Sequence, residues 1–227
     1  MIMTLIPVRP SLIFPKYQIV YADPPWQYKI IKDKNYDKKH VWRDPASHYQ
    51  AMATEDICKL PIRYVTAEDS ILFLWATFPK LLDALQVIEA WGFEYQGSAF
   101  LWVKQNINSM SFFEGMGYWT RKNTEPCLLA IKGHPKRIAK DVPELIVTTI
   151  MAHSHKPNEI TRGRIEKICG KLSRIELFAR QKAEGWDSWG NEVPNSVDLI
   201  EIGKICGTIR GNIDFRDEGE ENKDVDI

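Results

Sequence analysis

Short apolar runs alternate along most of this chain with segments whose apolar residues lie three or four positions apart. The runs are typical of buried strands and the wider spacing of amphipathic helices. Helices are predicted over residues 54–60, 79–91 and 157–169. Strands are predicted over residues 18–22, 70–76, 95–104, 126–132 and 174–178, with a short extended segment over 146–150. This alternation predicts an α/β fold in layers, with the apolar run 70–76 as a buried strand of a parallel sheet.

The helix boundaries are read from capping residues, glycine and proline. Thr54 is predicted to cap the amino end of the first helix, because its hydroxyl can accept a hydrogen bond from an unpaired N–H. Gly92 is predicted to end the second helix. Pro157 is placed in the first turn of the third helix, and Gly170 follows its end.

Polar segments separate these elements. Residues 27–50 are charged and lack apolar periodicity, so a long loop is predicted, and loops of this length are often functional. Residues 105–125 form a polar connection between two strands. Residues 211–227 are acidic and nearly without apolar side chains, which predicts a disordered tail. One domain is therefore predicted over residues 1–210.

Length and composition exclude several classes of protein. None of the apolar runs approaches the length of a membrane span, and three prolines interrupt the first fifteen residues, unlike a signal peptide. The four cysteines lie far apart with no pairing or metal-binding spacing, so reduced thiols and a cytoplasmic location are predicted. His153 and His155 have no acidic or cysteine partner nearby, and no metal site is predicted.

The net charge is zero but unevenly distributed. Residues 214–227 carry a net charge of −5, so residues 1–213 carry +5, and the basic residues gather in segments 29–43 and 102–140. Solvated surface is the plainer interpretation of such segments. Here, however, basic residues and aromatic residues are interleaved, a mixture that suits phosphate contacts and base stacking. The aromatic residues are Tyr28, Tyr36, Trp42 and Trp119.

The tetrapeptide Asp23-Pro24-Pro25-Trp26 follows directly after predicted strand 18–22. Each proline removes a backbone donor and fixes φ, so the strand ends abruptly and a carboxylate is held close to an indole. Asp23 and the Pro24 carbonyl, which is expected to be free, can accept both hydrogens of an exocyclic amine while Trp26 stacks on the base. Accepting both hydrogens localises the nitrogen lone pair and makes the amine a usable nucleophile.

Plainer alternatives exist for the same residues. Asp-Pro-Pro is also an ordinary turn with aspartate favoured at its first position, so Asp23 can be a turn-capping residue. Trp26 can equally fill the core. The tetrapeptide alone leaves both alternatives open.

Further segments agree in order and spacing with one protein family. Over residues 17–195 the chain resembles the family of the catalytic subunit of eukaryotic mRNA adenine-N6 methyltransferase, which includes bacterial and phage DNA adenine-N6 methyltransferases. The matching segments are Ala22–Trp26, Leu72–Trp75, Trp102–Lys104, Gly117–Trp119, Glu125–Gly133, Ser154–Ile160, Ile175–Arg180 and Trp189–Glu192. Several motifs in one order are more specific than any of them alone.

The resemblance implies a Rossmann-like, S-adenosylmethionine-dependent methyltransferase fold. Its sheet is mostly parallel, with helices on both faces, and the motif order is permuted so that the catalytic corner precedes the cofactor segment. The implied cofactor contacts are Ala22, Asp23, Phe178, Arg180, Asn191 and Glu192. Asn191 and Glu192 suit ribose hydroxyls or the cofactor's amino-acid end, and Arg180 offers a planar fork of donors. For Phe178 a core position is an equal alternative.

The chain also departs from the family pattern. Lys182 and Ala183 stand where some eukaryotic members have a His-Asn pair, so cofactor contacts from these two positions are in doubt. The first sixteen residues and everything after Pro194 have no match.

The implied reaction is direct methyl transfer to the N6 amine of an adenine flipped out of its stack. Asp23, Pro24, Pro25 and Trp26 are the predicted catalytic residues. The predicted substrate contacts are Tyr28, Trp42, Trp119, Arg121 and Lys156.

DNA is favoured over RNA, because the chain is compact and the zinc-finger module of some eukaryotic members is missing. The alternatives are an RNA adenine-N6 methyltransferase, or a catalytically silent nucleic-acid-binding partner of an active paralogue. The intact Asp-Pro-Pro-Trp motif argues against the catalytically silent partner. Monomer and homodimer both stay open.

Overall fold

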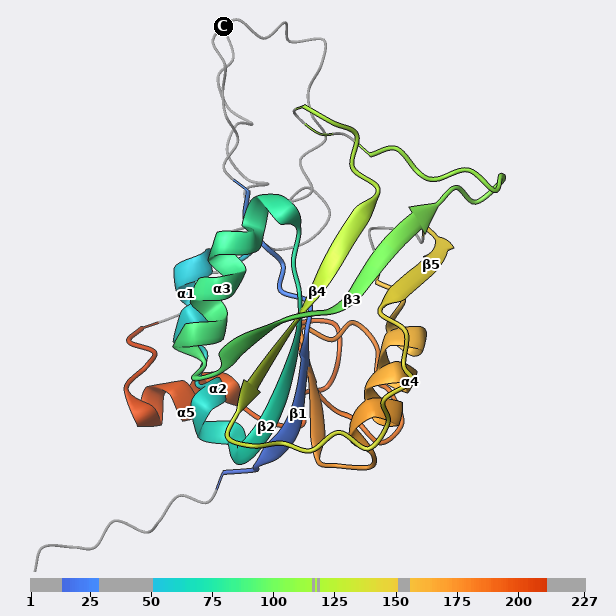
Figure 1. Ribbon diagram of the computed structural model, residues 1–227. Coiled ribbons are helices and arrows are strands. Elements are labelled where there is room, and N and C mark those ends of the chain that lie inside the picture. Colours follow the sequence, from blue (N-terminus) through green and yellow to red (C-terminus); the bar gives the residue numbers. More distant parts are fainter. Residues whose placement is uncertain (1–13, 29–50, 116, 118, 151–155, 212–227) are drawn as a thin grey trace, which may run out of the picture.

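A seven-stranded sheet forms the centre of the described part of the molecule (Figure 1). The computed structural model describes residues 14–28, 51–115, 117, 119–150 and 156–211. The strands lie in the order β5-β3-β4-β2-β1-β6-β7. Their bounds are β1 Tyr17–Ala22, β2 Thr66–Trp75, β3 Glu94–Gln105, β4 Thr124–Lys132, β5 Leu145–Thr149, β6 Arg174–Leu177 and β7 Asp187–Trp189. All predicted strands, and the extended segment over 146–150, are therefore confirmed.

Among these strands β4 alone runs against the others. It pairs antiparallel with both β2 and β3, whereas β1 with β2, β1 with β6, β3 with β5 and β6 with β7 all pair in parallel. The predicted mostly parallel sheet is thus confirmed, although β2 has one antiparallel neighbour. Ala22 is in register with Leu74 on one side and Leu177 on the other. The carboxyl ends of β1, β2 and β6 therefore meet at one edge of the sheet.

Helices cover both faces of the sheet, as the resemblance implied (Figure 1). Helix α4 packs on one face, and the remaining helices gather on the other. The bounds are α1 Thr54–Lys59, α2 Ile62–Val65, η2 Phe78–Lys80, α3 Leu81–Ala90, α4 Asn158–Cys169 and α5 Leu199–Cys206, where η2 is a 3₁₀ turn. The three predicted helices are confirmed, the second of them beginning with η2.

The alternation of side chains along the central strands creates two cores. Val20 and Leu72 contribute to the core under α1, α2, α3 and α5, whereas Tyr21 and Phe73 contribute to the core under α4. Successive strand residues point to opposite faces, so a strand covered on both faces is apolar throughout. This explains the uninterrupted apolar run of β2.

The predicted capping role of Thr54 is wrong. Ala53 occupies the N-cap position of α1, and no side-chain cap is formed there. The Thr54 hydroxyl instead donates a hydrogen bond to Asp83 Oδ1 of α3 at 2.5 Å. The hydroxyl therefore bonds to a residue that is distant in sequence and not to a backbone N–H of its own helix. Pro157, placed in the first turn by sequence, is the N-cap residue of α4.

Three short elements have no counterpart in the prediction, namely α2, β7 and α5. The first two contain only four and three residues. Helix α5 does carry a readable signal: the Asp198 side chain accepts a hydrogen bond from Glu201 N at 2.9 Å, and Gly207 closes the helix with a φ of +73°.

Several predictions lie outside the described residues. These are the greater part of loop 27–50 with Trp42, the absence of a metal site at His153 and His155, and the tail from residue 212 onward. Within the described ranges none of the helices has the length and apolar character that crossing a membrane requires.

Candidate active site

Three loops meet where parallel strands end, and the first of them is far from the other two in sequence. Asp23 follows β1, Phe178 follows β6 and Gly190 follows β7, and these strands are neighbours in the sheet. The chain leaves β1 toward β2 on one side, while β6 lies on the other side. In open α/β sheets ligands bind at such a switch point, outside the carboxyl ends of the strands. A ligand site is therefore expected at this edge of the sheet.

The corner after β1 is a tight turn. The Trp26 N–H donates to the Pro24 carbonyl at 2.9 Å, and the Met52 N–H donates to the Pro25 carbonyl at 2.7 Å. The prediction of a free Pro24 carbonyl is therefore wrong, because the two prolines turn the chain back on itself. A carbonyl oxygen has two lone pairs, so the Pro24 carbonyl keeps the capacity for one further hydrogen bond.

Trp26 lies in the core rather than on the surface of the site. The residue is only 5% exposed, and its indole N–H donates to the Trp75 carbonyl at 3.2 Å. This position agrees with the core-filling alternative and offers no open ring face for a base. We therefore assign Trp26 a structural role, in which it anchors the corner to β2.

Lys156 joins two carboxylates beside this corner. Its Nζ lies 3.0 Å from Asp23 Oδ1 and 2.9 Å from Glu125 Oε2, and 5.8 Å from the centre of the Trp75 ring. Lys104 Nζ pairs with the other oxygen of Glu125. The cluster thus contains two cations and two anions. The Asp23 side chain is 30% exposed, whereas those of Lys156 and Glu125 are 10% and 12% exposed, so Asp23 is the member that solvent or a ligand reaches most easily.

The pKa values in this cluster follow from burial opposed by charge. Burial acts to raise the pKa of the Glu125 carboxyl, but Lys156 and Lys104 outweigh it and hold that pKa below its ordinary value. Burial likewise acts to lower the pKa of Lys156, but Asp23 and Glu125 raise it above its ordinary value. Glu125 is thus ionised and Lys156 charged across the neutral range.

A buried chain of hydrogen bonds attaches the start of α4 to the sheet. Trp75 Nε1 donates to the Tyr21 hydroxyl at 2.8 Å, and that hydroxyl donates to Asn158 Oδ1 at 2.6 Å. Asn158 Nδ2 lies 3.4 Å from Glu176 Oε1, and Arg162 pairs with the other Glu176 oxygen at 2.7 Å. Because Asn158 lies two residues after Lys156, this network also fixes where the lysine enters the site.

The turn after β6 is strained. Phe178 has a φ of +60°, the one positive φ of a non-glycine residue in the described ranges. Its ring meets the Trp189 ring edge-on, with centres 5.4 Å apart. A Cβ at Gly190 would come within 2.3 Å of the Ala179 carbonyl oxygen, so only glycine lets the two loops approach this closely. Strain of this kind gathers at ligand sites and is maintained by surrounding contacts.

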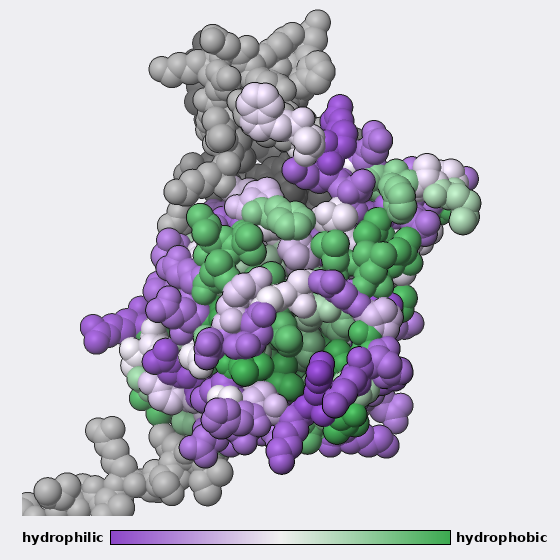
Figure 2. Space-filling model, viewed as in Figure 1, coloured by the Kyte–Doolittle hydropathy of each residue, from purple (hydrophilic) through white to green (hydrophobic). Residues whose placement is uncertain are grey.

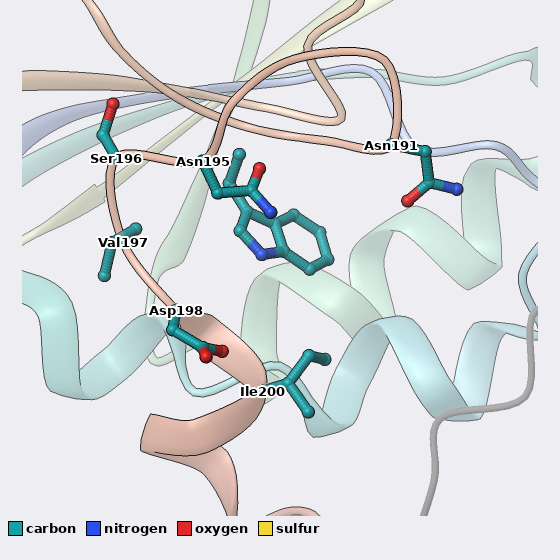
Figure 3. A pocket seen from close by; sticks show the side chains of 7 residues that line it. Asn191, Asn195, Ser196, Val197, Asp198 and Ile200 are labelled. Atoms are coloured by element: carbon teal, nitrogen blue, oxygen red, sulfur yellow. The ribbon is translucent and has the colours of Figure 1, made fainter.

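A cavity lies beside the end of β7, and Asn191 is the one predicted cofactor residue that lines it. Arg180 Nε lies 3.7 Å from Glu192 Oε1. Asn191 lines the cavity, whose volume is about 420 Å³, together with a carboxylate, a second amide and a hydroxyl beside an indole (Figure 3). These donors and acceptors suit a nucleoside. The full lining is Trp189, Asn191, Asn195, Ser196, Val197, Asp198 and Ile200.

The predicted substrate residues are spread around the same edge. The Tyr28 hydroxyl hydrogen-bonds Thr77 Oγ1 at 2.7 Å, and burial raises the pKa of that hydroxyl. Trp119 and Arg121 are both exposed on the loop between β3 and β4, Trp119 by 89%. Lys156 is brought into direct contact with Asp23. The Tyr28 hydroxyl is near enough to Asp23, Glu125 and Lys156 for their charges to affect its pKa.

Sequence reasoning assigned no role to Glu125, Tyr21 or Asn158. A carboxylate at the start of apolar strand β4 was a usable signal, because a buried charge requires partners. The hydroxyl of Tyr21 within an apolar strand was a similar one. Their partners come from distant segments and could not be read from spacing. In the described part of the chain there is no group of three or more His, Cys, Asp or Glu side chains placed to hold a metal ion.

The chain is similar in sequence to known proteins along most of its length. The MT-A70 family model matches residues 17–192. The Type II methyltransferase M.MunI from Mycoplasma sp is 36% identical over 211 residues, which cover 87% of each chain. The human N(6)-adenosine-methyltransferase catalytic subunit METTL3 is 29% identical over 193 residues, 83% of this chain but only 30% of METTL3. The resemblance drawn from sequence is confirmed, and the chain belongs to the MT-A70 family of S-adenosylmethionine-dependent adenine-N6 methyltransferases.

Proposed function

We propose that this protein methylates the N6 amine of adenine in DNA, and that Asp23 is the residue that orients the amine. The observation that carries the proposal is the position of the Asp23 carboxylate. It is the most exposed member of an otherwise buried charge cluster, at the sheet edge where β1 lies beside β6, next to β7 and its cavity.

In this proposal Lys156 fixes Asp23 by its contact with Oδ1, and Asp23 Oδ2 accepts a hydrogen from the adenine amine. The second lone pair of the Pro24 carbonyl accepts the other hydrogen. These two bonds localise the nitrogen lone pair and aim it. When bound, S-adenosylmethionine would supply a methyl group activated by the sulfonium, so that the methyl–sulfur bond breaks as the bond to N6 forms and the amine then releases one proton to solvent. The protein therefore contributes positioning and electrostatics rather than a covalent intermediate.

The cofactor is assigned to the cavity beside the end of β7 and to the neighbouring carboxyl ends of β6 and β1. Asn191 and Glu192 would bind ribose hydroxyls or the amino-acid end of the cofactor, and Arg180 its carboxylate. Ala22 and Asp23 at the end of β1, and Phe178 after β6, lie outside the cavity lining and would contact the part of the cofactor that extends beyond it toward β1. The strained backbone of Phe178 supports a ligand at this position.

Support for DNA comes from the relatives. The similarity to the Type II methyltransferase covers nearly the whole of that protein, whereas the similarity to METTL3 covers less than a third of it. A cytoplasmic, single-domain enzyme over residues 1–210 is part of the same proposal.

The test uses purified protein, S-adenosylmethionine with a labelled methyl group, and DNA and total RNA from one host. After digestion to nucleosides, the label is expected in N6-methyldeoxyadenosine. Label in the ribonucleoside instead would identify an RNA methyltransferase. Label in neither, with tight binding to both, would identify a silent nucleic-acid-binding partner. Sequencing of modified adenine in DNA from expressing cells then gives the recognition sequence.

A further inference from the structure

The described residues of the loop between β3 and β4 project from the body of the molecule as an arm (Figure 1). Its first part is closed by backbone hydrogen bonds, from Asn106 N to Ser111 O at 3.0 Å and from Phe113 N to Lys104 O at 2.8 Å. The Asn106 side chain adds bonds to Ser111 Oγ at 2.8 Å and to the Phe112 carbonyl at 3.2 Å. We refer to residues 106–111 as the tip turn. It is held internally, without help from the core.

The tip turn carries large apolar side chains into solvent. Met110 is 90% exposed and Ile107 67% exposed, and the adjacent Phe112 is 53% exposed. Figure 2 shows apolar residues gathered on the arm that projects from the body of the molecule. Apolar side chains displayed together on a rigid turn contribute nothing to the core and are typical of an interaction surface.

The base of the arm is part of the candidate active site. The backbone carbonyl of Lys104 accepts the hydrogen bond from Phe113 N. The side chain of Lys104 pairs with Glu125, which also pairs with Lys156. The arm therefore leaves the same sheet edge that presents Asp23. A six-residue extended segment spans at most about 20 Å, so Met110 stays within reach of a nucleic acid whose adenine lies at Asp23.

The composition of the arm favours nucleic acid over a protein partner. Residues 105–113 include no charged side chain, and Asn106, Asn108 and Ser109 supply neutral donors and acceptors suited to base edges and phosphates. The returning part of the arm exposes Arg121 and Lys122. Methionine, isoleucine and phenylalanine are also the kinds of side chain that wedge between base steps.

We infer that the tip turn enters the base stack of a duplex next to the target adenine, where Met110 and Ile107 fill the space that the flipped base leaves. This inference rests on the proposed function. A base leaves its stack at an energetic cost, and an apolar side chain in the vacated position keeps the neighbouring bases apart and slows the return of the adenine. We call these two side chains the wedge. The wedge should therefore speed methylation of a paired adenine but not of one that is already unpaired.

The test compares the double variant Ile107→Ala/Met110→Ala with the wild-type protein on two duplexes. One contains the mapped target site, and the other has an abasic position opposite the target adenine. We expect kcat/KM on the paired duplex to fall at least about tenfold, and kcat/KM on the abasic duplex to stay within about twofold. Ile138→Ala is the matched control, because Ile138 is 70% exposed and follows β4 at the opposite edge of the sheet.

A second readout does not depend on methyl transfer. With 2-aminopurine in place of the target adenine, fluorescence rises when the base leaves the stack, and the double variant should lose most of that rise. Unchanged activity and fluorescence on the paired duplex would overturn the inference, as would equal losses on both duplexes. A shift of the variant from dimer to monomer in light scattering would identify the tip turn as a contact between copies instead. A wild-type protein that flips the base without transferring methyl groups would contradict the proposed function and leave the wedge supported.

Discussion

At the residue scale, the charge cluster explains why Asp23 has a fixed orientation. Lys156 is shared between Asp23 and Glu125, and the second Glu125 oxygen is held by Lys104. Buried ion pairs gain little net free energy, but removal of one member leaves an uncompensated charge. In the proposed function Glu125 is therefore assigned as a positioning residue, which would act on the reaction through Lys156.

The first prediction concerns Glu125→Gln. At neutral pH the substitution should lower the free energy of unfolding by about 3 kcal/mol, because it leaves Lys104 without its partner and Lys156 with Asp23 alone. The folded-state pKa of Glu125 lies below the ordinary value of 4.5, so its carboxylate stabilises the fold above pH 4.5 and that contribution is lost as the pH falls further. In urea titrations the difference from wild type should shrink at acid pH.

The control is Glu176→Gln, for which the stability difference from wild type should change with pH in the opposite direction. Burial raises the pKa of Glu176 more than Arg162 lowers it, so the folded state binds a proton more readily than the unfolded state does. The stability of the wild type relative to this variant should grow as the pH falls toward 4.5. Parallel pH profiles for the two variants would contradict the account of the cluster.

At the scale of elements, the start of α4 connects the core to the site. The helix is attached to β1 and β2 through Tyr21, Trp75 and Asn158, all within a buried network. Lys156 precedes this helix directly. The position of the lysine therefore depends on the packing of a helix against the sheet and not on its own loop alone.

The second prediction compares two tyrosines of β1. Tyr21→Phe removes the hydroxyl that joins Trp75 to Asn158, and Tyr17→Phe removes a hydroxyl bonded to Asp187 at 2.7 Å near the opposite end of the strand. Each should destabilise the fold by about 1–2 kcal/mol. Only Tyr21→Phe should lower kcat, with the KM for S-adenosylmethionine unchanged, because only it releases the start of α4. Equal kcat values for the two variants would show that the network is purely structural.

The strands and longer helices could be predicted from sequence because their apolar patterns are local. The roles of Trp26 and Thr54 could not be predicted, because their side chains bond to Trp75 and Asp83, which are distant in sequence. The predicted cofactor set at the ends of β1, β6 and β7 came from the family resemblance, and the sheet places those strands side by side. The ion cluster around Glu125 exists only in three dimensions.

At the scale of the whole molecule, the sheet joins the first and last parts of the domain. The loops after β1 and β7 are separated by more than 160 residues along the chain, yet the two strands are separated by β6 alone. A ligand that contacts all three loops must bind the folded state only. Its binding is then coupled to the stability of the entire sheet.

The third prediction follows from this coupling. S-adenosylmethionine at one hundred times its Kd should stabilise the folded protein by about 2.7 kcal/mol, seen as a rise in Tm. Asn191→Ala should reduce that rise, because Asn191 lines the cavity. Gln96→Ala, an exposed change near the amino end of β3, should leave it intact. If S-adenosylmethionine raises the Tm of Asn191→Ala as much as that of the wild type, the cofactor does not bind in this cavity.

The most direct test of the central claim measures methyl transfer by Asp23→Ala beside Asp141→Ala. Asp141 is a matched control because its side chain is 74% exposed and pairs with Lys167 on the surface. We expect Asp141→Ala to transfer methyl groups to DNA adenine as the wild type does. Asp23→Ala should keep its fold but lose activity by a factor on the order of a hundred or more. Wild-type rates from a folded Asp23→Ala protein would contradict the account.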